Sequence, residues 1–251
     1  MKHTWRRALP LACLASLALL GPVLVAVPTS SAAPRPRSTS ASASAAASAA
    51  TKTIQLRLNA LHCDAGPADG VNGGWTRSAV IRFQSRHGLA QTGSVNPATR
   101  SWLFASKARR CDLRAAPARS GSGRRIVISQ QHNWVWLIAA NNRVLAQGGI
   151  VDNPGELHRG TYRTGSYCGR AARVRHNTSG SLWLDNFVRF APCGFGFHRI
   201  PRAKAGGKQI HPDWYLGTNL ATSHGCIRLS AAMSTRVWNF TAGPRTVVRV
   251  L

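Results

Sequence analysis

Acidic residues are scarce in this chain. Only 7 of its 251 residues are Asp or Glu, against 33 Lys and Arg, so the formal net charge is +26. A surface with this charge attracts polyanions whatever the fold. The basic residues form no consecutive block, however, and no nucleic-acid-binding motif is present, which argues against nucleic acid as the partner. The charge is instead typical of a protein that adsorbs to an anionic cell wall, provided that the chain is exported.

Metal-binding spacings are also missing. Imidazole and thiolate ligands suit zinc, and His198, His211, His224 and Cys226 are the candidates for such a set. Neither a C-x2-C nor an H-x3-H spacing supports them. We therefore predict no metal and no cofactor.

The N-terminus has the composition of a secretory signal. The basic start MKHTWRR precedes the apolar run ALPLACLASLALLGPVLVAV and the small residues TSSAA. Cleavage is expected after Ala32 or Ala33, which gives a signal peptide at residues 1–32. Its removal leaves 30 basic and 7 acidic residues, a net charge of about +23.

An uncleaved membrane anchor is the main alternative, because the run approaches the roughly 20 residues that span a bilayer. Pro10 and the pair Gly21–Pro22 interrupt it, which favours cleavage and no stable membrane span afterwards. Cys13 lacks the flanking residues of a lipoprotein signal. The pair Arg6–Arg7 fits a twin-arginine signal only in part, so the export route stays open.

Cysteine pairing follows from export. Without Cys13, five cysteines remain, and an oxidising compartment favours pairing four of them. Four cysteines allow three connectivities, among which the sequence alone does not choose. The domain boundaries favour Cys63–Cys111 and Cys168–Cys193, which leaves Cys226 as the odd thiol.

Two breaks in composition divide the exported chain. Residues 33–50, mostly Ala and Ser, lack large apolar side chains and are predicted to be a disordered linker. A second stretch rich in small and basic residues, 113–123, is predicted to be another linker. The predicted folded units are residues 51–112 and residues 124–251.

The first unit has the pattern of a three-helix bundle. Apolar residues at helical spacing begin at Ile54, Thr76 is expected to cap a second helix that stops at Gly88, and Asn96 with Pro97 opens a third. Such a small bundle has a small core, so a disulfide would stabilise it.

The second unit is rich in strands. The runs RRIVISQ, NWVWLIAA, RVLAQGGIV, GTYRTGSYC, SLWLDNFVRF, GFGFHRIP and RTVVRVL are β-branched or aromatic, and Asn141–Asn142 suits a hairpin turn. The segment LSAAMSTRVWNF is the one good helix candidate, with Ser230 as its cap. We predict a mainly-β domain, either a sandwich or a partly closed barrel.

The segment SHGCIRL, residues 223–229, has the features of a nucleophilic site. A reactive cysteine needs exposure, a base or cation, and donors for an oxyanion. Gly225 permits a close backbone approach, and the amides of His224, Gly225 and Cys226 can converge on a developing charge. A lone Cys beside Gly is more often a small buried side chain, but an unpaired one in an exported protein favours catalysis.

The first unit resembles the three-helix peptidoglycan-binding domain. Its segment IQLRLNALHCDAGPADGVNGGWTRSAVIRFQSRHGLAQTGSVNPATRSWL follows the pattern of that family over the whole unit. The matching positions are Gln55, Asp69, Gly70, Thr76, Phe83, Gln84, Gly88, Leu89, Gly93, Thr99 and Leu103. The resemblance implies that the unit binds peptidoglycan.

The second unit resembles the L,D-transpeptidases of the YkuD type, whose signature is a histidine followed by [ST]-H-G-C-x-[NR]. Besides SHGCIRL, the segments RRIVISQQHNWVWLI, HRGTYRTGS and FGFHRIP are similar to that family. The resemblance implies that Cys226 is the nucleophile and that His198 is the base, oriented by the backbone carbonyl of Arg199. The separation of His198 from Ser223 is longer than usual and that of His211 shorter, so His211 is the alternative base.

The same resemblance implies roles for the neighbouring residues. His224 and Gly225 belong to the oxyanion site, Ser223 braces the motif, and Arg228 holds a substrate carboxylate in a bidentate pair. Arg228 stands where many family members have Asn. Trp214 is expected to border the substrate groove.

The implied activity is peptidoglycan cross-linking outside the membrane. A Cys226 thiolate would attack the bond between the diamino acid and D-alanine of a tetrapeptide stem, and the thioester would pass to an amine of a neighbouring stem. The alternatives are an L,D-carboxypeptidase, in which water takes the acyl group, a non-catalytic wall-binding protein, and a cysteine endopeptidase or amidase. Peptidoglycan and anionic wall polymers are the expected partners of a secreted, wall-associated protein.

Overall fold

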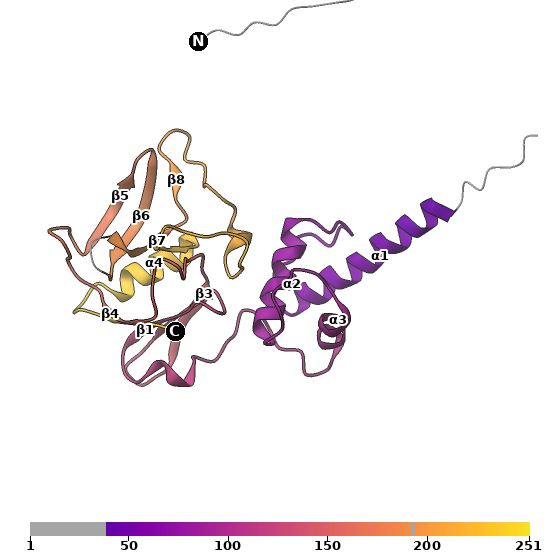
Figure 1. The fold of residues 1–251 in the computed structure, drawn as a ribbon, viewed down its shortest axis with the longest axis horizontal. Coiled ribbons are helices and arrows are strands. Elements are labelled where there is room, and N and C mark those ends of the chain that lie inside the picture. Colours follow the sequence, from indigo (N-terminus) through magenta and orange to yellow (C-terminus); the bar gives the residue numbers. More distant parts are fainter. Residues whose placement is uncertain (1–38, 192–193) are drawn as a thin grey trace, which may run out of the picture. The chain divides into compact units, whose positions relative to one another are not determined.

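The computed structural model describes residues 39–191 and 194–251 of the chain. The predicted signal peptide and Cys193 lie outside these residues. Residues 40–251 cluster into one unit, in which helices come first along the chain and strands follow (Figure 1). Within the described residues, no helix is both long and apolar enough to cross a bilayer.

The helical part contains α1 (Thr39–Ala60), α2 (Gly74–Arg86) and α3 (Pro97–Phe104), followed by the 3₁₀ helix η1 (Ala118–Ser120). The β part contains β1 (Arg125–Ser129), β2 (Trp134–Ile138), β3 (Val144–Gly149), β4 (Gly160–Arg163), β5 (Arg173–Ser179), β6 (Leu182–Arg189), β7 (Gly196–Arg199), β8 (Arg202–Ala203), β9 (Ile227–Leu229) and β10 (Val247–Val250). A second 3₁₀ helix, η3 (Asp213–Tyr215), and the helix α4 (Ala231–Phe240) lie within the β part.

The three predicted helices of the first unit enclose a core of their own. Leu58 from α1, Ala79 and Phe83 from α2, and Leu103 from α3 are all buried in it. The disulfide Cys63–Cys111 closes this core, with its Cα atoms 5.0 Å apart. The predicted Cys63–Cys111 pairing is therefore confirmed.

The helix caps agree with the sequence at one helix and differ at another. The Asn96 side chain accepts a hydrogen bond from the Thr99 amide and Pro97 follows it, as predicted for α3. The prediction that Thr76 caps α2 is wrong, because Gly73 occupies the cap. Thr76 lies inside the helix, where its buried hydroxyl accepts a hydrogen bond from Gln55.

The prediction of a disordered linker over residues 33–50 is corrected where the structure describes it. Helix α1 begins at Thr39, so residues 39–50 are helical, and residues 42–50 are exposed to solvent. Alanine has the highest helix propensity of any residue. The packed part of the helix from Ile54 onward supplies the costly nucleus, and the Ala-rich segment then extends it.

The residues predicted as a linker between the two units are also held in place. Arg114 is 6% exposed, and its guanidinium donates to the Ser85 hydroxyl and to the backbone carbonyls of Arg82 and Cys111. Its carbonyl accepts from the Trp136 indole. This segment therefore bonds to both α2 and β2.

The strands form two five-stranded sheets. One has the order β3-β2-β1-β10-β4, with β1 and β10 parallel and its other pairs antiparallel. The other has the order β5-β6-β7-β9, with β7 and β9 parallel and β8 added beside β6. Asn142 adopts a positive φ of 65° between β2 and β3, as expected for the predicted hairpin turn.

The main core lies between the two sheets and α4. It contains Ile126 and Val248 from the first sheet, Phe197 and Ile227 from the second, and Val237 from the helix. The Ser230 side chain accepts a hydrogen bond from the Met233 amide, so the predicted cap of α4 is confirmed. The predicted fold class, a three-helix bundle followed by a mainly-β domain, is confirmed, with two sheets and a helix packed between them.

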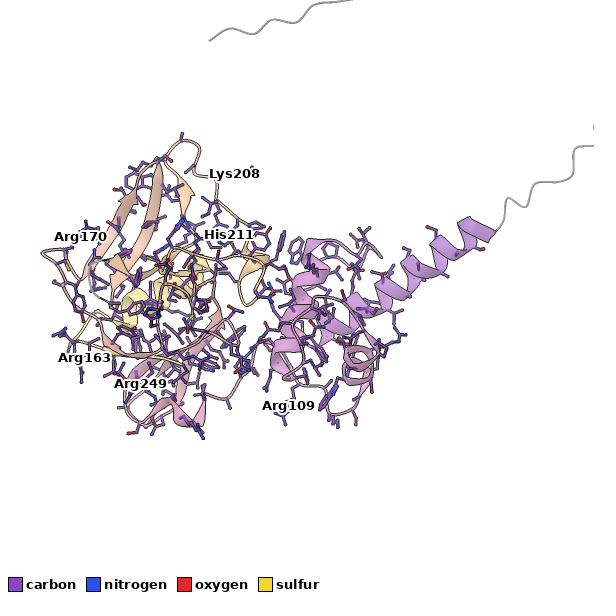
Figure 2. All side chains as sticks on the ribbon, in the orientation of Figure 1. Arg109, Arg163, Arg170, Lys208, His211 and Arg249 are labelled. Atoms are coloured by element: carbon purple, nitrogen blue, oxygen red, sulfur yellow. A yellow bond between two sulfur atoms is a disulfide. The ribbon has the colours of Figure 1, made fainter. Side chains whose placement is uncertain are left out.

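Basic side chains are spread over both parts of this unit. Arg109 of the helical part and Arg163, Arg170 and Lys208 of the β part are exposed, and Figure 2 shows them well separated from one another. The positive charge is therefore distributed rather than gathered in one groove.

Candidate active site

Cys226 directly precedes β9, whose pairing with β7 sets its surroundings. The two strands are parallel, with Phe197 opposite Ile227 and His198 opposite Arg228. Phe197 and Ile227 point into the main core. Because side chains alternate across a strand, His198, Cys226 and Arg228 lie on the opposite face of the sheet.

The thiol of Cys226 is partly exposed, and it is the free cysteine of the described residues. Its sulfur lies 3.8 Å from the carbonyl oxygen of Gly194. Burial raises the pKa of this thiol, while the Gly196 amide and the guanidinium groups of Arg189 and Arg228 oppose part of that rise. The resting site therefore favours the thiol over the thiolate at neutral pH.

The backbone before Cys226 is fixed by Ser223. Its hydroxyl accepts a hydrogen bond from the Gly225 amide at 3.0 Å, its own amide donates to the Asp152 carbonyl, and its carbonyl accepts from the Asn153 side chain. Gly225 has a φ of 102°, and a Cβ there would lie 2.2 Å from the Phe195 ring. Only glycine fits this position without displacement.

This arrangement changes the expected set of oxyanion donors. The amide of Gly225 is already bonded to Ser223, so it is not free for a substrate. The amides of His224 and Cys226 donate to no acceptor within the described residues. Two of the three predicted donors are thus available.

His198 is buried at 2% exposure. Its Nδ1 lies 2.6 Å from the carbonyl oxygen of Arg199, and its ring stacks on Phe187 with centroids 6.0 Å apart. Since a carbonyl only accepts, Nδ1 carries the proton and Nε2 presents a lone pair. Burial lowers the pKa of His198 to about 4, so the imidazole is neutral at pH 7.

His211, the alternative base, also has its Nδ1 near the backbone carbonyl of the next residue, but it lies in another part of the chain. Its Nδ1 lies 3.0 Å from the Pro212 carbonyl, and its Nε2 is buried with no hydrogen-bond partner in the described part of the chain. Burial lowers the pKa of this imidazole as well. His211 lies in the connection between β8 and η3 (Figure 2), whereas His198 lies on the strand paired with that of Cys226.

Two guanidinium groups face the thiol. Burial lowers the pKa of both Arg189 and Arg228, and the field of the Cys226 thiolate would oppose that effect. Arg189 is 4% exposed, and its Nε donates to the Ala171 carbonyl. Both cations can therefore stabilise an anion that develops beside Cys226.

The histidines and Cys226 do not form a metal site. In residues 39–191 and 194–251, no three His, Cys, Asp or Glu side chains are grouped closely enough to hold a metal ion. The second predicted disulfide is only half described. Cys168 is disulfide-bonded, but Cys193 lies outside the described residues, so the pairing Cys168–Cys193 stays a prediction.

A comparison with protein families decides the nature of the helical unit. Residues 47–103 match the family model PG_binding_1, described as "Putative peptidoglycan binding domain". This segment is similar to that domain family. The match covers α2 and the greater parts of α1 and α3, in agreement with the predicted resemblance. No match to the chain was found among curated proteins.

Several solved structures are similar to the chain at low identity. An L,D-transpeptidase from Xylanimonas cellulosilytica is 23% identical, with 80% of this chain and 93% of that chain covered and a TM-score of 0.46. An L,D-transpeptidase from Stackebrandtia nassauensis is 18% identical, with coverages of 80% and 90% and a TM-score of 0.41. A fused Zn-dependent amidase/peptidase/peptidoglycan-binding protein from Clostridium acetobutylicum is 18% identical, with coverages of 81% and 95% and a TM-score of 0.38. Because all three TM-scores lie below 0.5, these likenesses do not assign a function.

Trp214 contacts the peptidoglycan-binding domain instead of the cavity at Cys226. A Cβ on Gly74, at the start of α2, would lie 2.7 Å from the Trp214 ring, so the indole packs closely on that glycine. Trp214 does not line the cavity beside Cys226. That Trp214 borders a substrate groove stays a prediction.

Sequence reasoning missed several residues at the thiol. A cavity of about 480 Å³ opens beside Cys226, and Phe187, Arg189 and Arg170 line it. A Cβ on Gly196 would lie 2.6 Å from the Phe187 ring, so this glycine lets the ring cover β7. The sequence SLWLDNFVRF could have indicated two of these residues. Side chains alternate along a strand, so Phe187 and Arg189 lie on one face of it.

Proposed function

We propose that this protein is a peptidoglycan L,D-transpeptidase whose nucleophile is Cys226 and whose base is His198. The observation that carries the proposal is the parallel pairing of β7, which holds His198, with β9, which Cys226 directly precedes, together with the bond between Nδ1 of His198 and the Arg199 carbonyl. The SHGC motif and the peptidoglycan-binding domain at residues 47–103 point to the same substrate.

The first chemical step is acylation of Cys226. The Sγ–H proton passes to Nε2 of His198 while the sulfur attacks the carbonyl carbon of the diamino acid that precedes D-alanine. Because both groups are neutral at rest, transfer accompanies attack and no ion pair is formed beforehand. The amides of His224 and Cys226 donate to the oxyanion.

The intermediate then collapses. The C–N bond to D-alanine breaks, the imidazolium returns its proton to the leaving amine, and a thioester remains on Cys226. An amine of a second stem attacks the thioester carbon and His198 takes the amine proton. The sulfur then leaves and receives that proton from His198, which restores the neutral thiol and the neutral imidazole. The guanidinium groups of Arg189 and Arg228 lie beside the thiol and are the proposed partners of the substrate carboxylate.

The proposed site of action is the cell wall. The predicted signal peptide, the wall-binding domain and the distributed positive charge are mutually consistent with a secreted protein that adsorbs to anionic wall polymers. The binding domain would raise the local concentration of stem peptides around Cys226.

Mass spectrometry of the purified protein with tetrapeptide-containing fragments tests this function. We expect release of D-alanine and a new dimer linked through two third-position residues. Hydrolysed tripeptide without dimer would identify a carboxypeptidase, and cleavage of existing cross-links would identify an endopeptidase. Unchanged fragments, together with retained wall binding, would leave a non-catalytic wall-binding protein.

A further inference from the structure

The strongest observation outside the site is a buried guanidinium that joins the peptidoglycan-binding domain to the catalytic part. Arg82 lies on α2 and is 7% exposed. Its Nε donates to the Leu216 carbonyl at 2.9 Å and its Nη2 to the Trp214 carbonyl at 2.7 Å. One side chain of the binding domain thus holds two carbonyls of the segment around η3.

The same guanidinium is tied to its own domain. Nη1 donates to the carbonyl of Cys63 at 2.8 Å and to that of Asp64 at 3.2 Å. A buried cation is costly unless its donors are satisfied. In the docked arrangement the carbonyls of Trp214 and Leu216, together with those of its own domain, accept from Nε, Nη1 and Nη2, so the donors of the buried charge are satisfied.

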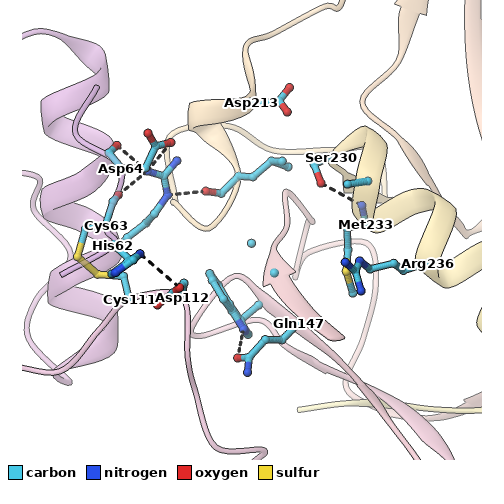
Figure 3. Close-up of a pocket in the computed structure, with 16 residues that line it drawn as sticks. His62, Cys63, Asp64, Cys111, Asp112, Gln147, Asp213, Ser230, Met233 and Arg236 are labelled. Atoms are coloured by element: carbon cyan, nitrogen blue, oxygen red, sulfur yellow. Dashed lines mark hydrogen bonds and ion pairs between the residues drawn. A yellow bond between two sulfur atoms is a disulfide. The ribbon is translucent and has the colours of Figure 1, made fainter. Parts of the chain in front are cut away.

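Other contacts lie beside this bond. The Trp214 ring packs on Gly74, and the Asn219 side chain donates to the Gln91 carbonyl at 3.2 Å. A cavity of about 340 Å³ adjoins them, and Arg82 and Leu216 line it. Figure 3 shows Asp64 of the helical part and Asp213 of η3 among its lining residues. The two parts are therefore not joined here by a continuous apolar core, and the bonds of Arg82 are the buried polar part of the contact.

Hydrogen bonds also connect η3 to β7, the strand that holds His198. Gln209 donates to the Asp213 carboxylate at 2.8 Å and accepts from the Arg199 guanidinium at 3.1 Å. Arg199 is the residue whose carbonyl holds Nδ1 of His198. Leu216 packs with Ile200 in a small buried cluster.

The segment is also bonded to the strand end that supports the motif. The Gly217 amide donates to the Ile150 carbonyl at 3.0 Å, and Val151, the next residue, pairs with Arg228. A Cβ on Gly149 would lie 2.5 Å from the Gly217 nitrogen, so the backbones are in close contact. Contacts from α2 to both His198 and the SHGC segment are therefore continuous.

We propose that Arg82 is a positioning residue, through which the peptidoglycan-binding domain holds the η3 segment in the conformation that the active site requires. The domain then contributes to turnover itself and not only to wall binding. This inference rests on the proposed transpeptidase function. It differs from a tether, because a tether would affect only substrates that contain glycan.

The test uses a soluble tetrapeptide substrate without glycan, so that wall binding does not enter the rate. Arg82→Met in the full chain is expected to lower kcat for D-alanine release by about tenfold or more, with binding to insoluble peptidoglycan retained. Arg77→Met is the matched control, because Arg77 lies exposed on the same helix. It should change neither quantity.

Hydrogen exchange supplies a readout that does not depend on activity. Protection of the Leu216 and Gly217 amides should fall in Arg82→Met and stay unchanged in Arg77→Met. If Arg82→Met does not fold cooperatively, Arg82→Lys replaces it with the same expectations, because an ammonium keeps the charge but lacks the fork that reaches two carbonyls.

The outcomes separate the two proposals. Normal kcat on the soluble peptide in Arg82→Met, despite lost protection at Leu216, would overturn the positioning role and leave the transpeptidase intact. Unchanged protection of the Leu216 and Gly217 amides in Arg82→Met would show that Arg82 does not hold η3. A wild-type protein that releases no D-alanine would overturn the proposed function, while the exchange measurement would still decide whether Arg82 holds η3.

Discussion

At the scale of single residues, the protonation states of Cys226 and His198 define the chemistry. Burial raises the pKa of the thiol and lowers that of the imidazole to about 4. Both shifts favour the neutral forms, in contrast to a resting thiolate–imidazolium pair. In the proposed mechanism the thiolate is therefore generated in the course of attack.

The pH profile of kcat/KM tests these states. The base must be unprotonated, so the acid limb should fall near pH 4 rather than near the ordinary imidazole value of about 6.5. Alkylation of free Cys226 by iodoacetamide should be slow at pH 7 and rise with pH above the ordinary thiol range. Rapid alkylation at pH 5 would indicate a resting ion pair and contradict this account.

Asp152 makes a second prediction at this scale. It is 3% exposed, its Oδ2 has no partner in the described residues, and burial raises its pKa to about 6. Between pH 4 and 6 the folded state binds more protons than the unfolded state, so stability falls as pH rises through this window. Asp152→Asn removes the effect and should raise the free energy of unfolding at pH 7 by about 3 kcal/mol, with little change at pH 4.

Urea unfolding at the two pH values measures this difference, with the exposed residue change Glu156→Gln as a control. An equal effect of Asp152→Asn at pH 4 and pH 7 would show that the carboxyl does not titrate as described.

At the scale of elements, the apolar pattern of the sequence predicted most of the helices and strands. It failed for a polar strand that forms only by pairing with its neighbour. Runs of β-branched and aromatic residues located β1, β2 and β3, and Ser230 located the start of α4. Strand β5 was not predicted, because its sequence RVRHNTS is polar and it lies at a sheet edge, held by pairing with β6.

The candidate site was predictable only in part. The motif identified Cys226, and the resemblance selected His198 with the Arg199 carbonyl, because those residues stand in recognisable segments. Arg189 and Arg82 were missed, since their contacts join elements far apart in the chain. The contact of Trp214 with Gly74 was missed for the same reason.

The backbone of the motif makes a prediction at the element scale. Gly225→Ala requires a Cβ at a φ of 102° and 2.2 Å from the Phe195 ring, which costs about 1–3 kcal/mol in strain and displaces the Cys226 amide. D-Alanine release should fall at least 100-fold or so. Gly243→Ala is the control, because nothing lies within 4 Å of a Cβ there. Full activity of Gly225→Ala would show that this backbone does not shape the site.

At the scale of the whole molecule, the small peptidoglycan-binding domain depends on its disulfide. Cys63 and Cys111 are separated by 48 residues and close the core of three short helices. The double change Cys63→Ser with Cys111→Ser should destabilise this domain by about 3–4 kcal/mol. Chemical unfolding with and without reductant measures the loss, and a stability indifferent to reductant would contradict the role given to the bond.

The proposed function and the proposed role of Arg82 combine at this scale. In that proposal the binding domain brings the protein to peptidoglycan, the bonds of Arg82 hold η3, and the pairing of β7 with β9 brings His198 to the segment that begins after Cys226. The central claim is that Cys226 acts with His198 as its base.

The most direct test is the intact mass of the enzyme after brief mixing with a tetrapeptide stem. We predict an acyl adduct with D-alanine released for the wild type and for His211→Ala, and no adduct for Cys226→Ala or His198→Ala, with all four proteins folded. A normal adduct on His198→Ala, or its loss only in His211→Ala, would contradict the account.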